Sequence, residues 1–162
     1  MCKLKKLGVE NLTAICNLYN DIKQKTETVW EDDYPCVELI KWDIERNGLY
    51  ALVTEDGEMI AVAYAGKRNE EDDDCCDWKL DIKNRATFAR FGVSPKYQRQ
   101  GFGKKMLLKI FQLLKEQGFD GIRILVEPNN TNAICLYKKL NFINSGITEK
   151  NNKKYILLER FI

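Results

Sequence analysis

Apolar residues recur along the chain at two spacings, one typical of helices and the other typical of strands. Between Leu12 and Ile22 they follow one another at intervals of three and four residues, which predicts an amphipathic helix with Asn11 as its N-cap. The same spacing predicts three further helices, over 36–47, 105–117 and 131–140. Gly48 and Gly118 follow two of these helices, so a left-handed residue is expected at each position.

Short β-prone runs alternate with these helices. They predict strands over 4–7, 49–54, 59–65, 86–93, 122–127, 142–148 and 155–162. Asp56-Gly57 and the stretch 150–153 supply turns for two hairpins. Because the helices lie between strand pairs rather than after every strand, the pattern favours a mixed α/β sheet over a fully parallel one. No repeat and no linker rich in Ser, Gly or Pro interrupts residues 1–162, so a single domain is predicted.

A polar segment over 67–85 carries a run of acidic residues and is predicted to be a loop. Six carboxylates cluster there: Glu70, Glu71, Asp72, Asp73, Asp74 and Asp77. Such a run is typical of a solvated loop, and beside an acceptor site it would also favour a cationic substrate. The adjacent Cys75 and Cys76 are either a redox pair or two unrelated thiols.

Composition and charge exclude several classes of function. The chain has 162 residues with 26 Lys and Arg against 24 Asp and Glu, a net charge of +2, so no overall basic field would collect nucleic acid or anionic lipid. It has no histidine and no CxxC pair among six cysteines, which argues against a metal site and against a nucleophile activated by histidine. No apolar run approaches the roughly 18 residues of a membrane span. The basic start lacks the apolar stretch of a secretory signal, so a cytoplasmic protein with reduced thiols is expected.

The stretch 89–105 carries the first candidate chemistry. It predicts a strand, a loop that holds Gly101 and Gly103, and the start of a helix. Unpaired N–H groups and the positive end of the helix dipole at such a junction attract an anion such as a phosphate. Four basic residues add positive charge: Lys96, Arg99, Lys104 and Lys105. The spacing fits neither a Walker loop nor a dinucleotide GxGxxG, and a tight turn before a solvated helix end is the alternative.

Two motifs make the stretch more specific. The first is Gln98-Arg99-Gln100-Gly101-Phe102-Gly103, and the second runs from Asn130 through Ala133, Leu136, Tyr137 and Leu140 to Phe142. Together they resemble the consecutive signatures of the GNAT superfamily of acetyl-CoA-dependent N-acetyltransferases, over about residues 86–145. The resemblance implies a GNAT-like fold, α/β with a mixed sheet: a single central splayed β-sheet of six to seven strands flanked by about four helices.

The resemblance also implies how acetyl-CoA would bind. Main-chain groups of Phe91 and Val93 would pair with the pantetheine arm like an added strand. The loop and the first turn of the next helix would hold the pyrophosphate: Gln98, Arg99, Gln100, Gly101, Phe102, Gly103 and Lys104. Asn130 would bind the pantetheine arm or fix its own turn, and a plain helix cap is the alternative.

Two side chains are the catalytic candidates. By resemblance, Tyr137 would act as general acid on the departing thiolate, because a phenol of pKa about 10 is protonated at neutral pH; a core aromatic is the alternative. An ammonium must lose a proton before it attacks. Some relatives place a Glu where this chain has Leu125, so Glu127 is the nearest candidate base. A solvated strand end, or a water chain in place of a base, is equally consistent with the sequence.

The function implied is transfer of the acetyl group of acetyl-CoA to a primary amine of a small molecule or peptide by direct nucleophilic attack, without a metal. The rival is a non-catalytic module that binds acetyl-CoA or CoA. A nucleotide-binding or RNA-associated domain rests only on the basic loop and is not favoured, and no membrane partner is expected. Trp30 and Trp78 would line the acceptor pocket or serve as core anchors. The resemblance is compatible with a homodimer.

Overall fold

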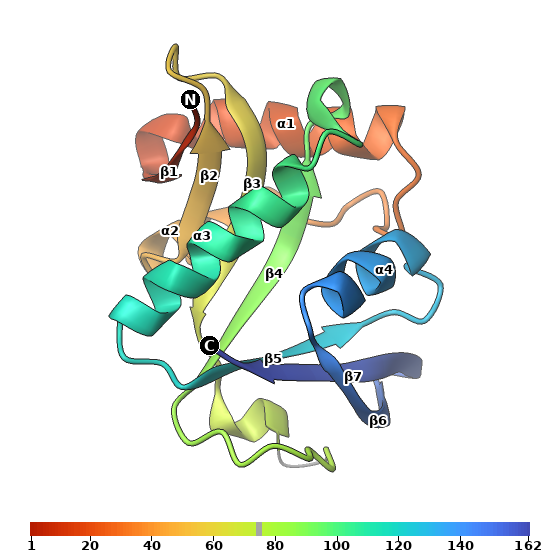
Figure 1. Cartoon of the computed structure of the whole chain (residues 1–162). Helices are drawn as coiled ribbons and strands as arrows, with labels where there is room; N and C mark the ends of the chain where they lie inside the picture. The colour runs from red at the N-terminus through yellow and green to blue at the C-terminus, as the bar shows by residue number, and fades with distance from the viewer. Residues whose placement is uncertain (74–75) are drawn as a thin grey trace. The chain divides into compact units, whose positions relative to one another are not determined.

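The computed structural model describes residues 1–73 and 76–162. Within these ranges the chain forms seven strands and four α-helices (Figure 1). In chain order they are β1 (Lys3–Lys6), α1 (Leu12–Lys25), α2 (Val37–Glu45), β2 (Leu49–Val53), β3 (Met59–Lys67), β4 (Arg85–Val93), α3 (Phe102–Glu116), β5 (Gly121–Val126), α4 (Thr131–Lys139), β6 (Ile143–Lys150) and β7 (Lys153–Phe161). Each helix and strand lies where the hydrophobic pattern predicts it, with ends that differ by a few residues.

The strands form a mixed sheet, as predicted, in the order β1-β2-β3-β4-β5-β7-β6. The pairs β1–β2, β2–β3, β5–β7 and β6–β7 are antiparallel, and β4 pairs with β5 in parallel. This parallel pairing joins only the first two residues of each described strand, Arg85 with Gly121 and Ala86 with Ile122. The described pairing of β4 with β5 is therefore confined to the start of each strand.

The chain forms two compact units. The first consists of residues Met1–Gly66 and Phe88–Ile110, and the second of residues Lys67–Thr87 and Phe111–Ile162. In the first unit, one face of α1 is buried through Ile15, Leu18, Tyr19 and Ile22. These residues share a core with β2, which is buried at every position. Each such apolar side chain contributes about 1.5 to 3 kcal/mol when it leaves water.

The second unit has its own apolar contacts around α4 and the end of α3. The Phe142 ring lies 5.9 Å from Phe111 and 5.7 Å from Tyr137, measured between ring centroids. The guanidinium of Arg160 lies 4.9 Å from the Phe111 ring. The β6–β7 hairpin turns at Asn151 and Asn152, both left-handed with φ of 52° and 61°. Two left-handed residues fit the tight turn predicted over 150–153.

The end of α2 differs from the prediction. The left-handed residue is Asn47, with φ of 57°, and not Gly48. Asparagine tolerates this conformation better than other residues with a Cβ, so it can end the helix. Gly48 is required for space instead, because a Cβ there would lie 2.3 Å from the Tyr64 ring. At Gly118, with φ of 89°, the expectation is confirmed.

Candidate functional site

The loop between β4 and α3 is held by its own side chains. After Val93 the chain passes through a short 3₁₀ turn over Pro95–Tyr97. The side-chain amide of Gln98 donates to the Val93 carbonyl at 3.1 Å, and that of Gln100 donates to the Lys96 carbonyl at 3.0 Å. The two glutamines therefore fix the path of the loop and leave its main-chain N–H groups for other partners.

Two left-handed residues bring the loop into α3. Arg99 has φ of 59° and Gly101 has φ of 81°. A main-chain hydrogen bond at the start of the helix runs from the Lys105 N–H to the Gly101 carbonyl at 3.1 Å. Helix geometry leaves the preceding N–H groups, on Phe102, Gly103 and Lys104, without a carbonyl in the helix. A Cβ built on Gly101 would meet no atom within 4 Å. Open space, exposed N–H groups and the helix dipole together suit a pyrophosphate.

The basic residues of this loop do not all have the same surroundings. Lys96 Nζ donates to Glu58 Oε1 at 2.8 Å, and the Tyr97 hydroxyl donates to Glu58 Oε2 at 2.7 Å. The hydrogen bond from Lys96 lowers the pKa of Glu58, and Glu58 raises the pKa of Lys96. Three other basic side chains have no ion-pair partner among the described residues: Arg99, Lys104 and Lys105. Those three, rather than Lys96, can face an anion.

β4 carries an irregular residue just before the predicted pantetheine contacts. Arg90 is left-handed, with φ of 51°, in the middle of the strand. The carbonyl of Arg90 accepts a hydrogen bond from the Tyr19 hydroxyl at 2.9 Å. Phe91 and Val93 are partly exposed and Gly92 is buried. Neither the left-handed residue nor its partner on α1 was predicted, because the spacing of apolar residues does not report φ.

The loop between α1 and α2 was considered as a candidate through Trp30 alone, and its charge was missed. It carries four exposed carboxylates within seven residues: Glu27, Glu31, Asp32 and Asp33. Its Trp30 packs edge to face against Tyr19, with the ring centroids 5.6 Å apart. A Cβ on Gly92 would lie 3.0 Å from the Trp30 ring, so this loop lies directly against β4. The density of carboxylates in the sequence was the available signal, but the longer acidic run over 70–77 is the more conspicuous cluster.

In the second unit, Asn130 directly precedes α4 and Tyr137 lies on it. The Asn130 side chain accepts from the Ala133 N–H at 3.3 Å and so caps the helix. Tyr137 is 6% exposed, and burial raises the pKa of its phenol. Glu127, just after β5, has a side chain 28% exposed and lies 4.0 Å from Lys153 Nζ. Asn130 is thus a helix cap and Tyr137 a buried aromatic, the alternatives that the sequence also allowed for them. Neither arrangement conflicts with a role in the reaction.

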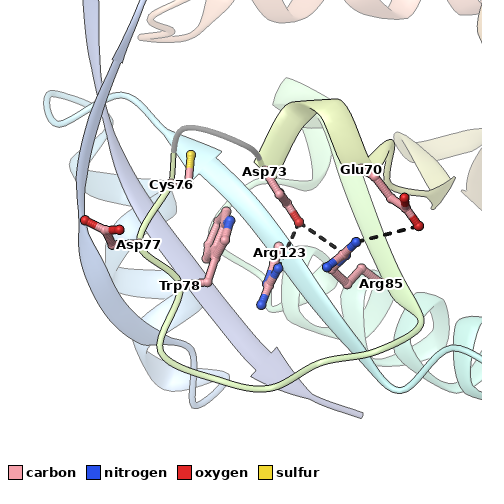
Figure 2. A pocket seen from close by; sticks show the side chains of 7 residues that line it. All are labelled: Glu70, Asp73, Cys76, Asp77, Trp78, Arg85 and Arg123. Atoms are coloured by element: carbon pink, nitrogen blue, oxygen red, sulfur yellow. Dashed lines mark hydrogen bonds and ion pairs between the residues drawn. The ribbon is translucent and has the colours of Figure 1, made fainter.

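The acidic segment is not wholly solvated, contrary to the simpler expectation for a loop. The Asp73 side chain is 8% exposed and pairs with Arg68 at 2.6 Å, Arg123 at 2.9 Å and Arg85 at 3.3 Å. Figure 2 shows Asp73 between Arg123 and Arg85, with Glu70 paired to Arg85. These side chains line a pocket of about 460 Å³ together with Cys76, Asp77 and Trp78. The redox pair proposed at Cys75-Cys76 involves Cys75, which lies outside the described residues.

Trp78, which lines this pocket, and Glu159 on β7 connect the acidic segment to the sheet. Trp78 lies near two guanidinium groups, 4.9 Å from that of Arg123 and 5.5 Å from that of Arg68. Glu159 on β7 is fully buried and accepts from the main-chain N–H groups of Lys79 and Leu80 at 2.6 and 2.9 Å. The charges of the pocket are therefore largely paired with one another, and Trp78 both lines the pocket and contacts two arginines of the second unit.

The described part of the chain offers neither a cluster of metal ligands nor a membrane-spanning helix. Across 1–73 and 76–162, His, Cys, Asp and Glu side chains form no group of three or more that could hold a metal ion. The helices in these ranges fall short of the length and apolarity that crossing a bilayer requires.

Comparison with known proteins gives consistent matches. The profile of the acetyltransferase (GNAT) family matches residues 12–142. The spermine/spermidine N(1)-acetyltransferase of Bacillus subtilis is 28% identical over 159 residues, which are 96% of this chain and 97% of that protein. A GNAT-family acetyltransferase structure from Streptococcus agalactiae has a TM-score of 0.84 at 19% identity, covering 99% of this chain and 95% of the other. The PaiA N-acetyltransferase of Thermoplasma acidophilum, solved with coenzyme A, has a TM-score of 0.71 at 18% identity, covering 100% and 99%.

Proposed function

The chain belongs to the GNAT family of acetyltransferases and transfers the acetyl group of acetyl-CoA to a primary amine, and on this premise we propose that its acceptor is a polyamine. The acidic loop between α1 and α2 is the observation that carries the proposal. Its exposed carboxylates lie on the segment that packs through Trp30 against Gly92 of β4. A polyamine carries several positive charges at neutral pH, so these carboxylates attract it. The Bacillus relative is named for spermine and spermidine, which supports the same class of acceptor.

We propose that the donor binds to the first unit through main-chain groups. The N–H groups over 99–104 hold the pyrophosphate, and Gln98 keeps their loop in place through its bond to Val93. Phe91 and Val93 offer main-chain groups to the pantetheine arm. Asn130 acts by fixing the turn before α4, consistent with its bond to Ala133.

The proposed chemistry needs one base and one acid. Acetyl-CoA supplies a thioester carbonyl, which the neutral amine attacks directly. Glu127, directly or through water, accepts the proton that the ammonium must lose. The Tyr137 hydroxyl gives its proton to the sulfur as the carbon–sulfur bond breaks, and the second proton that the nitrogen loses on becoming an amide restores the phenol. Because burial raises the pKa of Tyr137, the phenol keeps the proton it has to donate.

We propose that the protein works in the cytoplasm, as its relatives' use of acetyl-CoA and its own free thiols at Cys2, Cys16, Cys36 and Cys135 suggest. A homodimer stays a prediction. Light scattering of the purified protein would measure the mass directly.

Release of CoA from acetyl-CoA tests the proposed acceptor. Spermidine and spermine should be acetylated with a higher kcat/KM than a neutral peptide with a free N-terminus. The advantage should shrink as salt rises, because exposed charges more than about 10 Å apart are screened at 0.1 M. An equal or higher kcat/KM for the neutral peptide would refute the polyamine assignment and leave the acetyltransferase activity in place.

A charge variant connects the preference to the loop. Changing Asp32 and Asp33 together to Asn should raise KM for spermidine roughly fivefold at low salt, since exposed pairs of charges are worth up to about 1 kcal/mol each. The KM for acetyl-CoA should not change. Asp56→Asn removes an exposed carboxylate from the β2–β3 turn of the same unit and serves as the matched control. The same KM for spermidine in both variants would exclude the α1–α2 loop as its binding site.

A further inference from the structure

The left-handed residue in β4 has a Cβ. Its backbone conformation is therefore unfavourable unless contacts with the rest of the protein stabilise it. Arg90 has φ of 51°. Residues other than glycine adopt this region rarely and mostly in turns, where Asn and Asp are preferred to a long side chain. A strand continues on both sides of Arg90, from Arg85 to Val93. Contacts to the rest of the first unit must therefore define this conformation.

The side chain of Arg90 is fixed by a residue on α2. Its Nε lies 2.5 Å from Asp43 Oδ2 and its Nη2 lies 2.7 Å from Asp43 Oδ1, a bidentate pair. Asp43 is completely buried, and the Arg90 side chain is 11% exposed. Burial alone would lower the pKa of Arg90, but Asp43 and Tyr34 offset this and raise it, so the guanidinium stays charged. Two parallel hydrogen bonds set the orientation of a guanidinium as well as its position.

The main chain of Arg90 is fixed by a residue on α1. The Tyr19 hydroxyl donates to the Arg90 carbonyl at 2.9 Å, and Tyr19 is 1% exposed. A carbonyl inside a strand ordinarily accepts from the neighbouring strand. The Arg90 carbonyl accepts from a side chain of another element. Two helices thus hold residue 90, α1 through its carbonyl and α2 through its guanidinium.

We propose that Asp43 and Tyr19 are positioning residues for acetyl-CoA, which hold Arg90 left-handed so that the main-chain groups from Phe91 to Val93 are directed at the pantetheine arm. The inference rests on the proposed role of Phe91 and Val93. Asp43 and Tyr19 lie in sequence far from these residues, and they act through Arg90 rather than on the ligand. Preorganisation of this kind strengthens binding because the strand need not rearrange when the ligand arrives.

Two double variants that differ by a single Cβ test the proposal. Asp43→Ala with Arg90→Gly and Asp43→Ala with Arg90→Ala both remove the buried ion pair and leave the same cavity. Glycine adopts the left-handed region without cost, whereas alanine does not. The glycine variant should bind CoA about fivefold or more tightly than the alanine variant, measured by isothermal titration calorimetry on protein shown by circular dichroism to be folded. Equal dissociation constants would overturn the proposal.

Tyr19→Phe provides a second test of the proposal in case the double variants do not fold. It removes only the hydroxyl that binds the Arg90 carbonyl, and should raise KM for acetyl-CoA roughly three- to tenfold with kcat within about twofold, the range for loss of one hydrogen bond. The matched control is Tyr50→Phe, which removes a hydroxyl bonded at 3.4 Å to the Asn47 carbonyl and should leave KM unchanged. The same KM in both variants would refute the positioning role.

CoA binding by the wild-type protein distinguishes a failure of this inference from a failure of the proposed donor site. If it does not bind CoA at all, the donor site itself is wrong. If it binds CoA and none of the variants of Asp43, Tyr19 or Arg90 changes the dissociation constant, the donor site stands and only the positioning role is refuted.

Discussion

Tyr137 is the residue on which the proposed proton transfer depends most directly. Its hydroxyl is buried on α4 and its pKa is raised, so it remains a proton donor over the whole neutral range. Tyr137→Phe keeps the ring that packs against Phe142 and removes the proton. We expect kcat to fall roughly 100-fold, the lower end of the range for general acid catalysis, with the dissociation constant for CoA unchanged. A kcat within about twofold of the wild type would leave Tyr137 as a core aromatic.

Burial of Tyr19 and Tyr137 also predicts how stability depends on pH. Burial raises the pKa of both phenols in the folded state, whereas in the unfolded chain they titrate near pH 10. Above that pH the unfolded state releases protons that the folded state retains, so the free energy of unfolding should fall as pH rises beyond about 10. Tyr137→Phe should make the fall less steep. Thermal midpoints between pH 9 and 11 measure this, and parallel curves for the two proteins would contradict it.

Single residues were the hardest part of the site to predict. Asn130 and the glutamine-rich loop were found because they lie in two local motifs that resemble the GNAT signatures, and their hydrogen-bond partners lie within five residues in sequence. The pair between Asp43 and Arg90 joins residues 47 positions apart, so no local pattern indicates it. At the end of α2, the left-handed residue is Asn47, and the adjacent Gly48 is needed for the space beside Tyr64. A glycine after a helix therefore did not mark the left-handed position.

At the scale of elements, the helices and strands were predictable because each depends on a pattern a few residues long. The segment over 67–84 was not, because distant residues hold it in place. Asp73 pairs with Arg123, 50 positions away, and Glu159 accepts from Lys79, 80 positions away. A cluster of acidic residues gives the same sequence pattern whether its side chains are solvated or paired with distant residues.

Asp73 therefore carries a prediction about this segment. Asp73→Ala would leave three arginines around a buried site without their common partner, and breaking a buried ion pair from one side costs about 3 to 5 kcal/mol. We expect a loss of this size in the free energy of unfolding, measured in urea. Asp77→Ala, which removes an exposed carboxylate from the same pocket, should change it by less than about 0.5 kcal/mol. Equal losses would show that the ion pairs of Asp73 contribute little.

At the scale of the whole molecule, three elements are shared by both compact units. Lys67 of β3, residues 85–87 of β4 and residues 111–116 of α3 belong to the second unit, and the rest of each element belongs to the first. Neither unit keeps these elements intact if the other unfolds alone. We therefore expect a single transition in differential scanning calorimetry, which would support the predicted single domain. CoA at about 100 times its dissociation constant should add about 2.7 kcal/mol to stability and raise that one midpoint. Two resolved transitions, of which CoA shifts one, would contradict it.

The anchoring of Arg90 has a consequence for how acceptor preference can diverge. Tyr19 precedes the acidic α1–α2 loop and Asp43 follows it, so these two anchors of residue 90 lie outside the loop, whereas Tyr34, which also bonds to the Arg90 side chain, lies within it. Residues 26–36 can therefore be exchanged as a cassette, as long as Tyr34 is kept and Trp30 or a similar ring still covers Gly92. A library confined to Glu27, Glu31, Asp32 and Asp33 would vary the charge presented to the amine while the donor strand keeps its shape. Duplicated genes could acquire new substrates by the same route without rebuilding the site for acetyl-CoA.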